Sequence, residues 1–182
     1  LAQQRLYKGY YGILAYTFVR SEFTTRDDSF EPSAWDNRHV LSLTGGKKWA
    51  RGYELGVRWK YLGGAPYTPD NVALSAQQGV WDVTGRGVPD YGRLNSERNG
   101  PLHQLDVRFD KKWFRKNSSI DLYFDIQNLY AFQPRLAPIL LVDRDANGAP
   151  VPDPGNPGSY RMHFTREDTG SLLPTIGVTF EF

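Results

Sequence analysis

Apolar and polar residues alternate with a period of two along much of the chain. In the stretch 53–61 every second residue is apolar, and this set is Tyr53, Leu55, Val57, Trp59 and Tyr61. The residues between them are charged or glycine. Successive side chains of a β-strand point to opposite faces, whereas a helix would spread this set around its axis. The stretch therefore predicts a strand with one apolar and one polar face.

The same alternation recurs in other stretches. It is found in residues 12–23, 39–47, 105–110, 120–127 and 175–182. Together these give about six strands, each near the 9–11 residues that cross a bilayer as a tilted strand. Residues 1–6 are expected to be the tail of a further strand. The predicted fold class is all-β, built from antiparallel transmembrane strands of a barrel.

The connections between the predicted strands alternate in length. Short ones are predicted at 7–9, 49–52 and 113–118. Long ones are predicted at 24–38, 63–101 and 131–171. The long segments are rich in Pro, Gly, Asn and Asp, so no helix is predicted in them. Short turns at one end and long loops at the other are typical of bacterial outer-membrane barrels.

Aromatic residues gather near the predicted strand ends. Those by the short connections are Tyr10, Tyr11, Trp49, Tyr53, Trp113 and Phe114. Those toward the long loops are Trp59, Tyr61 and Tyr130. Aromatic rings with a polar tip favour the head-group level of a membrane, so the two sets predict two girdles.

Composition excludes several kinds of partner and site. The 22 Lys and Arg residues nearly balance the 20 Asp and Glu residues, so no nucleic-acid partner is expected. The chain has no Cys, which excludes disulfides, zinc-thiolate sites and a Cys nucleophile. No apolar run approaches the roughly 20 residues of a membrane helix. Residues 1–5 lack the apolar core of a signal peptide, so the chain is expected to be a fragment of a mature protein.

Two pairs of residues invite a catalytic interpretation. These are His39 with Ser42, and His103 with Asp106. Residues three apart on a strand face opposite sides of the sheet, so neither pair is expected to act together. No catalytic residue and no cofactor are predicted, and the protein is not expected to be an enzyme.

One segment matches the start of a calcium-binding loop, at Asp143, Asp145, Asn147 and Gly148. The twelfth position of such a loop would be Pro154, where a bidentate Glu is expected. The simpler interpretation is a type I′ hairpin turn at Asn147-Gly148 that joins residues 139–142 to Val151. The turn is predicted, and calcium is kept as an alternative.

Several segments, taken in order, resemble the C-terminal barrel of TonB-dependent receptors. Trp35-Asp36-Asn37-Arg38-His39 resembles the start of a descending strand in that family. Tyr61-Leu62-Gly63-Gly64-Ala65-Pro66-Tyr67-Thr68-Pro69 resembles a strand that opens into an external loop. The next descending strand and the penultimate one are matched by Arg93-Leu94-Asn95-Ser96-Glu97-Arg98 with His103-Gln104-Leu105-Asp106-Val107-Arg108, and by Asp125-Ile126-Gln127-Asn128-Leu129-Tyr130.

The end of the chain carries a further resemblance. The residues Ile176, Val178, Phe180 and Phe182 share one face up to the last residue. A terminal aromatic residue with alternate apolar residues before it resembles the signal read by the barrel-assembly machinery. An edge strand with one apolar face can add to an open sheet, which gives such a signal a physical basis.

The resemblance implies a function in active transport. A member of the family has an N-terminal plug inside a barrel of about 22 strands. Residues 1–182 would supply six to seven of those strands and no plug. The implied function is uptake of a scarce nutrient (iron chelate, cobalamin, oligosaccharide or peptide) across a Gram-negative outer membrane. The implied partners are outer-membrane lipid, the rest of the receptor, the TonB complex through the missing N-terminal part, and the barrel-assembly machinery.

The resemblance also assigns candidate sites. Loops on a rigid scaffold carry binding, so the substrate-binding candidates lie in the external loops 63–101 and 131–171 and include Tyr67, Trp81, Tyr91 and Arg93. Charged residues on the polar faces of neighbouring strands would face the lumen and the plug: Glu54, Arg58, Lys60, Asp106, Arg108, Asp110, Asp121 and Asp125. Opposed charges on adjacent strands can pair. This wall is either a solvated lumen or a plug-docking surface that releases during transport.

Two other functions fit parts of the pattern. One is a small passive or structural outer-membrane barrel of about eight strands. The other is a soluble β-sandwich adhesin, which would be extracted from cells without detergent. The number of strands in the sheet and the destination of its apolar face distinguish these alternatives.

Overall fold

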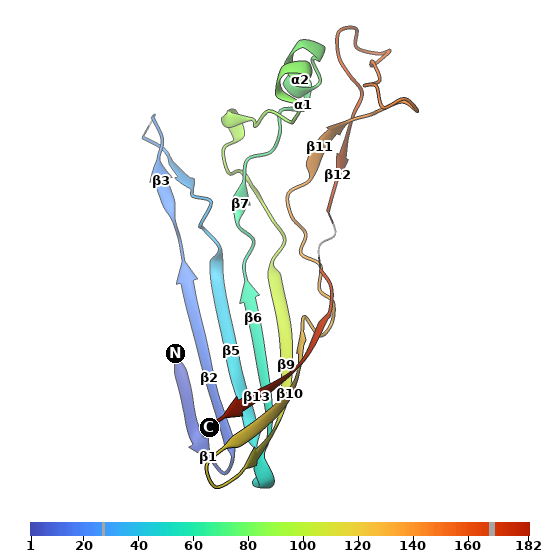
Figure 1. Ribbon diagram of the computed structural model, residues 1–182. Coiled ribbons are helices and arrows are strands. Elements are labelled where there is room, and N and C mark those ends of the chain that lie inside the picture. The colour runs from blue at the N-terminus through green and yellow to red at the C-terminus, as the bar shows by residue number, and fades with distance from the viewer. Residues whose placement is uncertain (27, 168–169) are drawn as a thin grey trace.

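A seven-stranded antiparallel sheet forms the body of the protein (Figure 1). The structure is a computed structural model that describes residues 1–26, 28–167 and 170–182. In spatial order the sheet strands are β1 (Ala2–Tyr7), β2 (Tyr10–Val19), β5 (Arg38–Lys48), β6 (Tyr53–Leu62), β9 (Leu102–Phe114), β10 (Ser119–Gln127) and β13 (Leu173–Glu181). The predictions of antiparallel strands, and of a further strand within residues 1–6, are confirmed.

The period of two in the sequence appears as two chemically different faces of this sheet. Val57 in β6 lies opposite Gly45 in β5 and Val107 in β9, while its neighbour Arg58 lies opposite Thr44 and Asp106. Opposed residues of antiparallel strands point to the same face. On β5, β6, β9 and β10 one face is therefore mainly apolar, and the other is mainly polar and charged.

The connections separate by length between the two ends of the sheet (Figure 1). The short ones are the turn after β1, the 3-10 turn η1 (Ala50–Gly52) between β5 and β6, and residues 115–118 between β9 and β10. The long ones carry small hairpins: β3 (Glu22–Thr24) with β4 (Phe30–Pro32), and β7 (Pro66–Tyr67) with β8 (Glu97–Arg98). The predicted segregation of loop lengths is confirmed.

The expectation that the long loops contain no helix is wrong. The loop between β6 and β9 forms α1 (Val72–Ser75), α2 (Gln78–Thr84) and the 3-10 turn η2 (Tyr91–Arg93). The Asn71 side chain caps α1 by accepting a hydrogen bond from the Leu74 amide at 3.0 Å. Gly85 ends α2 in the left-handed conformation, with its amide donating to the Trp81 carbonyl. These caps stabilise short helices in a segment rich in loop-forming residues.

The hairpin expected around Asn147 is only partly correct. β11 (Ile139–Val142) pairs with β12 (Met162–Thr165) and not with Val151. A tight turn does occur, but it is closed by the Gly148 amide donating to the Asp145 carbonyl at 3.0 Å. Gly148 has positive φ, whereas Asn147 is not among the described residues with positive φ, so the turn is not type I′.

The two longest loops pack together beyond the end of the sheet that lies opposite the short turns (Figure 1). The buried side chains of Ala76, Trp81, Leu140 and Val142 all lie in these loops. The Tyr160 amide donates to the Ala76 carbonyl at 2.7 Å, and a β-bridge joins Gln77 to Ser159. The loop layer (residues 63–101 with 131–167) therefore has a small core of its own.

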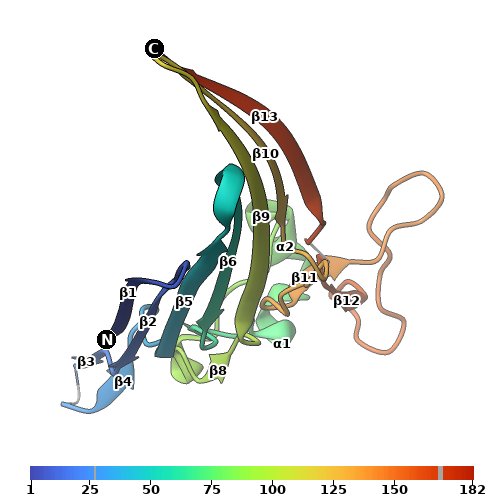
Figure 2. The same ribbon diagram turned by 90° about the horizontal axis from the view of Figure 1, so that it is seen from below.

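The sheet itself is an open, curved wall. Figure 2 shows β1 at one edge and β13 at the other, with the two edges apart. Among the described residues no strand joins β1 to β13, so they do not form a closed barrel. None of the described helices is long and apolar enough to span a membrane.

Candidate functional site

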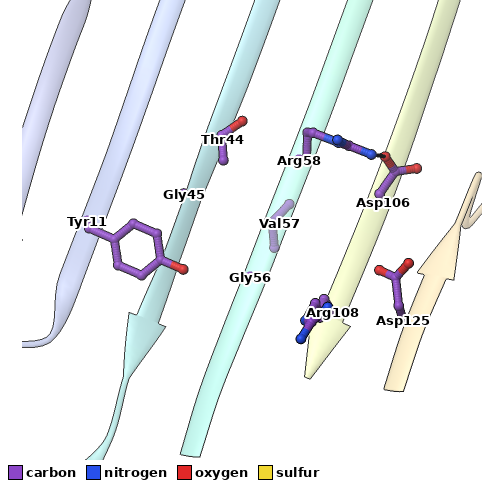
Figure 3. Close-up of a pocket in the computed structure, with 9 residues that line it drawn as sticks. All are labelled: Tyr11, Thr44, Gly45, Gly56, Val57, Arg58, Asp106, Arg108 and Asp125. Carbon is purple, nitrogen blue, oxygen red and sulfur yellow. Dashed lines mark hydrogen bonds and ion pairs between the residues drawn. The ribbon is translucent and has the colours of Figure 1, made fainter. Parts of the chain in front are cut away.

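The charged residues predicted to face a lumen do lie on one face of the sheet, which we call the polar face. The register sets Glu54 opposite Asp110, Arg58 opposite Asp106, and Arg108 opposite Asp125. Lys60 and Asp121 point to the same face, because each is an even number of residues from Arg58 and Asp125 on its own strand. Side chains of this face line a hollow of about 300 Å³, and Figure 3 shows Tyr11, Arg58, Asp106, Arg108 and Asp125 around it.

Asp106 is the most constrained charge on this face. It is only 5% exposed. Arg58 donates to its Oδ2 from Nε at 2.9 Å and from Nη2 at 2.7 Å, while Gln104 and the Asn128 amide donate to its Oδ1 at 2.6 and 3.0 Å. A buried carboxylate needs this many donors to offset the loss of water. Asp106 thus joins β6, β9 and the end of β10.

Arg108 pairs along its own strand and not across it. Its guanidinium donates to Asp110 at 2.6 and 2.9 Å, and its carbon lies 4.0 Å from the centre of the Tyr123 ring. Asp125 lies opposite Arg108 in the register and lines the same hollow. The stacking holds a positive charge in the middle of the polar face, where it can meet an acidic group.

Tyr11 belongs to the polar face, so its assignment to an aromatic girdle is wrong. Its hydroxyl donates to Glu54 at 2.6 Å, and Glu54 also pairs with Lys48 at 3.2 Å. The ring lies over Gly46, where an added Cβ would stand 2.6 Å from the hydroxyl and 2.4 Å from the Leu55 carbonyl oxygen. Phe114 also has the parity of the polar face, opposite Ser119. Both errors have the same cause. The girdle prediction uses the distance of a residue from a turn and does not consider the face of the strand to which its side chain points.

One charged group on the polar face has an unmet hydrogen-bonding requirement. Asp121 Oδ1 is the one buried side-chain oxygen that lacks a partner among the described residues. Leaving a buried acceptor without a donor costs about 1–3 kcal/mol or more. A donor from another segment or from water would satisfy it.

The opposite, apolar face of the sheet carries both histidines of the predicted pairs. His39 bonds the Tyr16 hydroxyl through Nδ1 at 2.9 Å, and His103 bonds that of Tyr130 at 2.7 Å. Asp106 lies on the polar face, opposite in parity to His103. The parity argument for separate faces therefore holds for His103 and Asp106, as it does for His39 and Ser42.

The substrate-binding candidates separate into different environments. Tyr67 and Arg93 line a pocket of about 440 Å³ between the two long loops. Both contact Glu97, which accepts from the Tyr67 hydroxyl and from Arg93, each at 2.7 Å. Tyr91 is exposed outside the residues that line this pocket, and Trp81 is buried in the core of the loop layer. The structure brings together only Tyr67 and Arg93.

The calcium-loop residues are engaged in other contacts. Asp145 Oδ1 accepts from the amides of Asn147 and Ala149 at 2.9 and 2.8 Å. Asp143 contacts His163 at 2.5 Å and Arg161 at 3.5 Å. Within the described ranges no three side chains of His, Cys, Asp or Glu are grouped so that they could hold one metal ion. The tight turn therefore engages Asp145 and Asn147, while Asp143 pairs with Arg161 and with His163 of β12.

A buried ion-pair cluster in the loops was not predicted from the sequence. Asp36 is 1% exposed, and its carboxylate accepts from Arg98 and from the Ser21 amide. Arg98 also donates to the main-chain oxygens of Asp36 and Gly64. Burial acts to raise the pKa of Asp36, but the Arg98 and Ser21 hydrogen bonds and the charges of Arg98 and Arg38 hold this pKa below its ordinary value.

The last strand presents its predicted apolar residues on the apolar face. Ile176, Val178 and Phe180 lie opposite Phe124, Leu122 and Ile120 of β10. All three are at least half exposed, and Phe182 follows the end of β13. The other edge of β13 has no partner strand among the described residues.

No family model, no curated protein and no solved structure matches this chain.

Proposed function

We propose that this chain forms part of the wall of an outer-membrane β-barrel that belongs to a TonB-dependent receptor. The observation that carries the proposal is the two-faced sheet. Its apolar face leaves Leu14, Leu43, Phe109 and Phe124 between 42 and 45% exposed. Soluble monomers rarely expose contiguous apolar surface on this scale. Lipid would cover the apolar face, and the charged polar face would line the interior.

The open edges of the sheet favour a larger barrel over a small one. Unpaired backbone groups of an edge strand cost several kcal/mol each in hydrocarbon, so β1 and β13 each require a neighbouring strand. A barrel of about eight strands would need a single added strand to bridge these edges, which lie apart in Figure 2. Further strands of the same receptor would bridge them.

The polar face suits a plug that docks and is then released. Asp121 Oδ1 on this face lacks a donor among the described residues, and Arg108 and Asp125 line the hollow of the polar face. Polar contacts through water let two surfaces separate at lower cost than apolar packing would. In this proposal the TonB complex acts on the plug, the loop layer binds the scarce nutrient, and no covalent chemistry takes place.

Labelling on intact cells tests the location and orientation. Epitope tags inserted at Gly85 and Gly155, which lie in the loop layer, should bind antibody without permeabilisation. A tag at Asn117, in the short connection between β9 and β10, should bind only after permeabilisation. Labelling of Asn117 with no signal at Gly85 would invert the topology, and recovery of the protein in a soluble extract would overturn the proposal.

A growth assay tests the transport role. Cells that lack the gene should lose growth on one of four limiting sources: an iron chelate, cobalamin, an oligosaccharide or a peptide. An uncoupler of the inner-membrane gradient should abolish uptake of that source by wild-type cells, because active uptake requires energy. Uptake that continues after uncoupling would indicate a passive barrel.

A further inference from the structure

The same three-residue arrangement occurs twice at the short-turn end of the apolar face. In each case a Tyr that starts one strand lies directly opposite a Lys near the end of the next strand, and a Trp follows that Lys by two residues. The two sets are Tyr10 with Lys47 and Trp49, and Tyr53 with Lys111 and Trp113. We refer to these sets as the lysine clamps.

Each lysine clamp holds an ammonium group among aromatic rings. The Lys47 ammonium donates to the Tyr10 hydroxyl at 2.6 Å and lies 4.3 Å from the centre of that ring and 5.4 Å from that of Trp49. The Lys111 ammonium lies 3.8 Å from the Tyr53 ring and 5.4 Å from the Trp113 ring. Both lysines are half-buried, because their stems lie along the apolar face.

The lysine clamps retain capacity to bind an anion. An ammonium group has three donors. Lys47 uses one on Tyr10, and Lys111 uses one on the main-chain oxygen of Arg51, which leaves two donors on each within the described hydrogen bonds. The four aromatic rings are between 41 and 53% exposed. An acceptor can therefore approach each ammonium from outside the sheet.

The sequence around the lysine clamps is basic. The connections 7–9, 49–52 and 115–118 contain Lys8, Arg51, Arg115 and Lys116 and no acidic residue. Such a cluster favours an anionic partner. Between the two clamps on the apolar face lies Leu55, which is opposite both Lys47 and Phe109. The surface therefore combines two cations with apolar neighbours, as an anionic amphiphile requires.

We infer that the lysine clamps bind the phosphate groups of anionic phospholipids in the leaflet next to the short turns. This inference rests on the proposed membrane location. The rings and lysine stems lie in the part of the hydrocarbon layer nearest the head groups of that leaflet, and the ammonium groups meet the phosphates at head-group level. β5 and β9 are two strand spacings apart, about 10 Å, so each clamp takes its own head group. The acyl chains lie along Leu55 and Phe109.

Lipid retention tests this inference on the full-length protein. The protein is placed in nanodiscs of equal parts phosphatidylglycerol and phosphatidylcholine with identical acyl chains, extracted in mild detergent and analysed by native mass spectrometry. A lysine at a membrane surface contributes about 1 kcal/mol of attraction to anionic lipid, or about a fivefold preference per clamp. Wild-type protein should retain phosphatidylglycerol in about that excess.

Variants distinguish a lipid preference that comes from the lysine clamps from one that comes from the overall charge of the protein. The double variant Lys47→Gln with Lys111→Gln should bring the two lipids close to equal retention. Lys60→Gln, the same change on the polar face, should leave the preference intact, and the double change to Arg should preserve it because Arg keeps the charge and the ring contact. A double Gln variant that retains the wild-type preference would overturn the inference.

A salt series provides a test that needs no variant. Exposed charge pairs are screened within about 3 Å at 1 M ionic strength, so the preference of the wild-type protein should fall toward equality in high salt. A preference that high salt does not change would overturn the inference. Recovery of the protein in the outer-membrane fraction is measured in parallel: failure there would overturn the proposed function, whereas normal recovery without a lipid preference would overturn the inference about the clamps alone.

Discussion

Replacing Asp36 by Asn should release the two loops that its carboxylate joins. Asp36 lies between β4 and β5 in the first long loop, and its partner Arg98 lies in β8 of the second. The change keeps the shape of the side chain and removes its charge. It leaves the Arg98 guanidinium, whose side chain is 32% exposed, without its carboxylate partner.

The magnitude follows from burial. Removing one partner of a buried ion pair costs about 3–5 kcal/mol, because the remaining charge is left desolvated. Arg98 and Arg38 both reach solvent, which reduces this cost, so we expect about 3 kcal/mol for local opening. This equals more than a hundredfold increase in the population of the open loop.

Hydrogen exchange on the full-length protein measures this opening. The amides of Ser21 and Asn99, which donate to Asp36 Oδ1 and to the Ala65 carbonyl, should exchange about a hundredfold faster in Asp36→Asn, while amides in the middle of β6 stay unchanged. Glu22→Gln, which breaks the exposed pair of Arg20 with Glu22 in the same loop, should change the exchange little. Equal effects of the two variants would refute the assignment of Asp36 as the joining group.

The same cluster predicts a pH dependence. Because the pKa of Asp36 is lower in the folded loops than its ordinary value near 3.9, its contribution is complete above that value and is lost as the pH falls through the lowered pKa. Loop exchange in wild-type protein, corrected for intrinsic exchange, should therefore accelerate only in acid. Asp36→Asn should show no such acid step.

Three further changes test separate parts of the structure. Gly46→Ala should reduce folding, because its Cβ would lie 2.4 Å from the Leu55 carbonyl oxygen, whereas Gly79→Ala in α2 meets nothing within 4 Å and should be neutral or stabilising by about 1 kcal/mol; urea unfolding compares them. Val57→Arg should cost about 2–4 kcal/mol if this position faces the bilayer midplane, seen as a reduced outer-membrane level, with Lys60→Arg as the control on the polar face. Phe182→Asp should reduce the outer-membrane level more than Phe182→Tyr, because a ring with a polar tip suits the head-group region. Equal levels of the two variants would show that Phe182 has no role in assembly.

The strands of the sheet could be predicted because the pattern that marks each of them lies within a few consecutive residues. The alternation that sorts Val57 from Arg58 requires only neighbouring residues, and the registers place every predicted lumen residue on one face. The short connections could be predicted for the same reason. The girdle prediction fails for Tyr11 and Phe114, because closeness to a turn does not determine the face of the sheet to which a side chain points.

The loops could be predicted less well because their contacts are non-local. Asp36 and Arg98 are separated by 62 positions, and nothing in either segment marks the other as its partner. β11 pairs with β12 across about twenty intervening residues, and closing so long a loop costs more entropy than closing the shorter one to Val151, so the sequence alone favours Val151 as the partner. The helices α1 and α2 were recognisable only from Asn71 and Gly85, two caps that also occur in ordinary turns.

Spin-label accessibility at four single positions tests the central claim that lipid covers the apolar face. This chain has no Cys, so labels at Leu43→Cys and Val57→Cys report the apolar face, and labels at Thr44→Cys and Lys60→Cys report the polar face. In membranes, oxygen, which concentrates in lipid, should relax the first pair more strongly. A water-soluble nickel chelate should relax the second pair. Nickel access at Val57 and Leu43, or no access by either reagent there, would contradict the account.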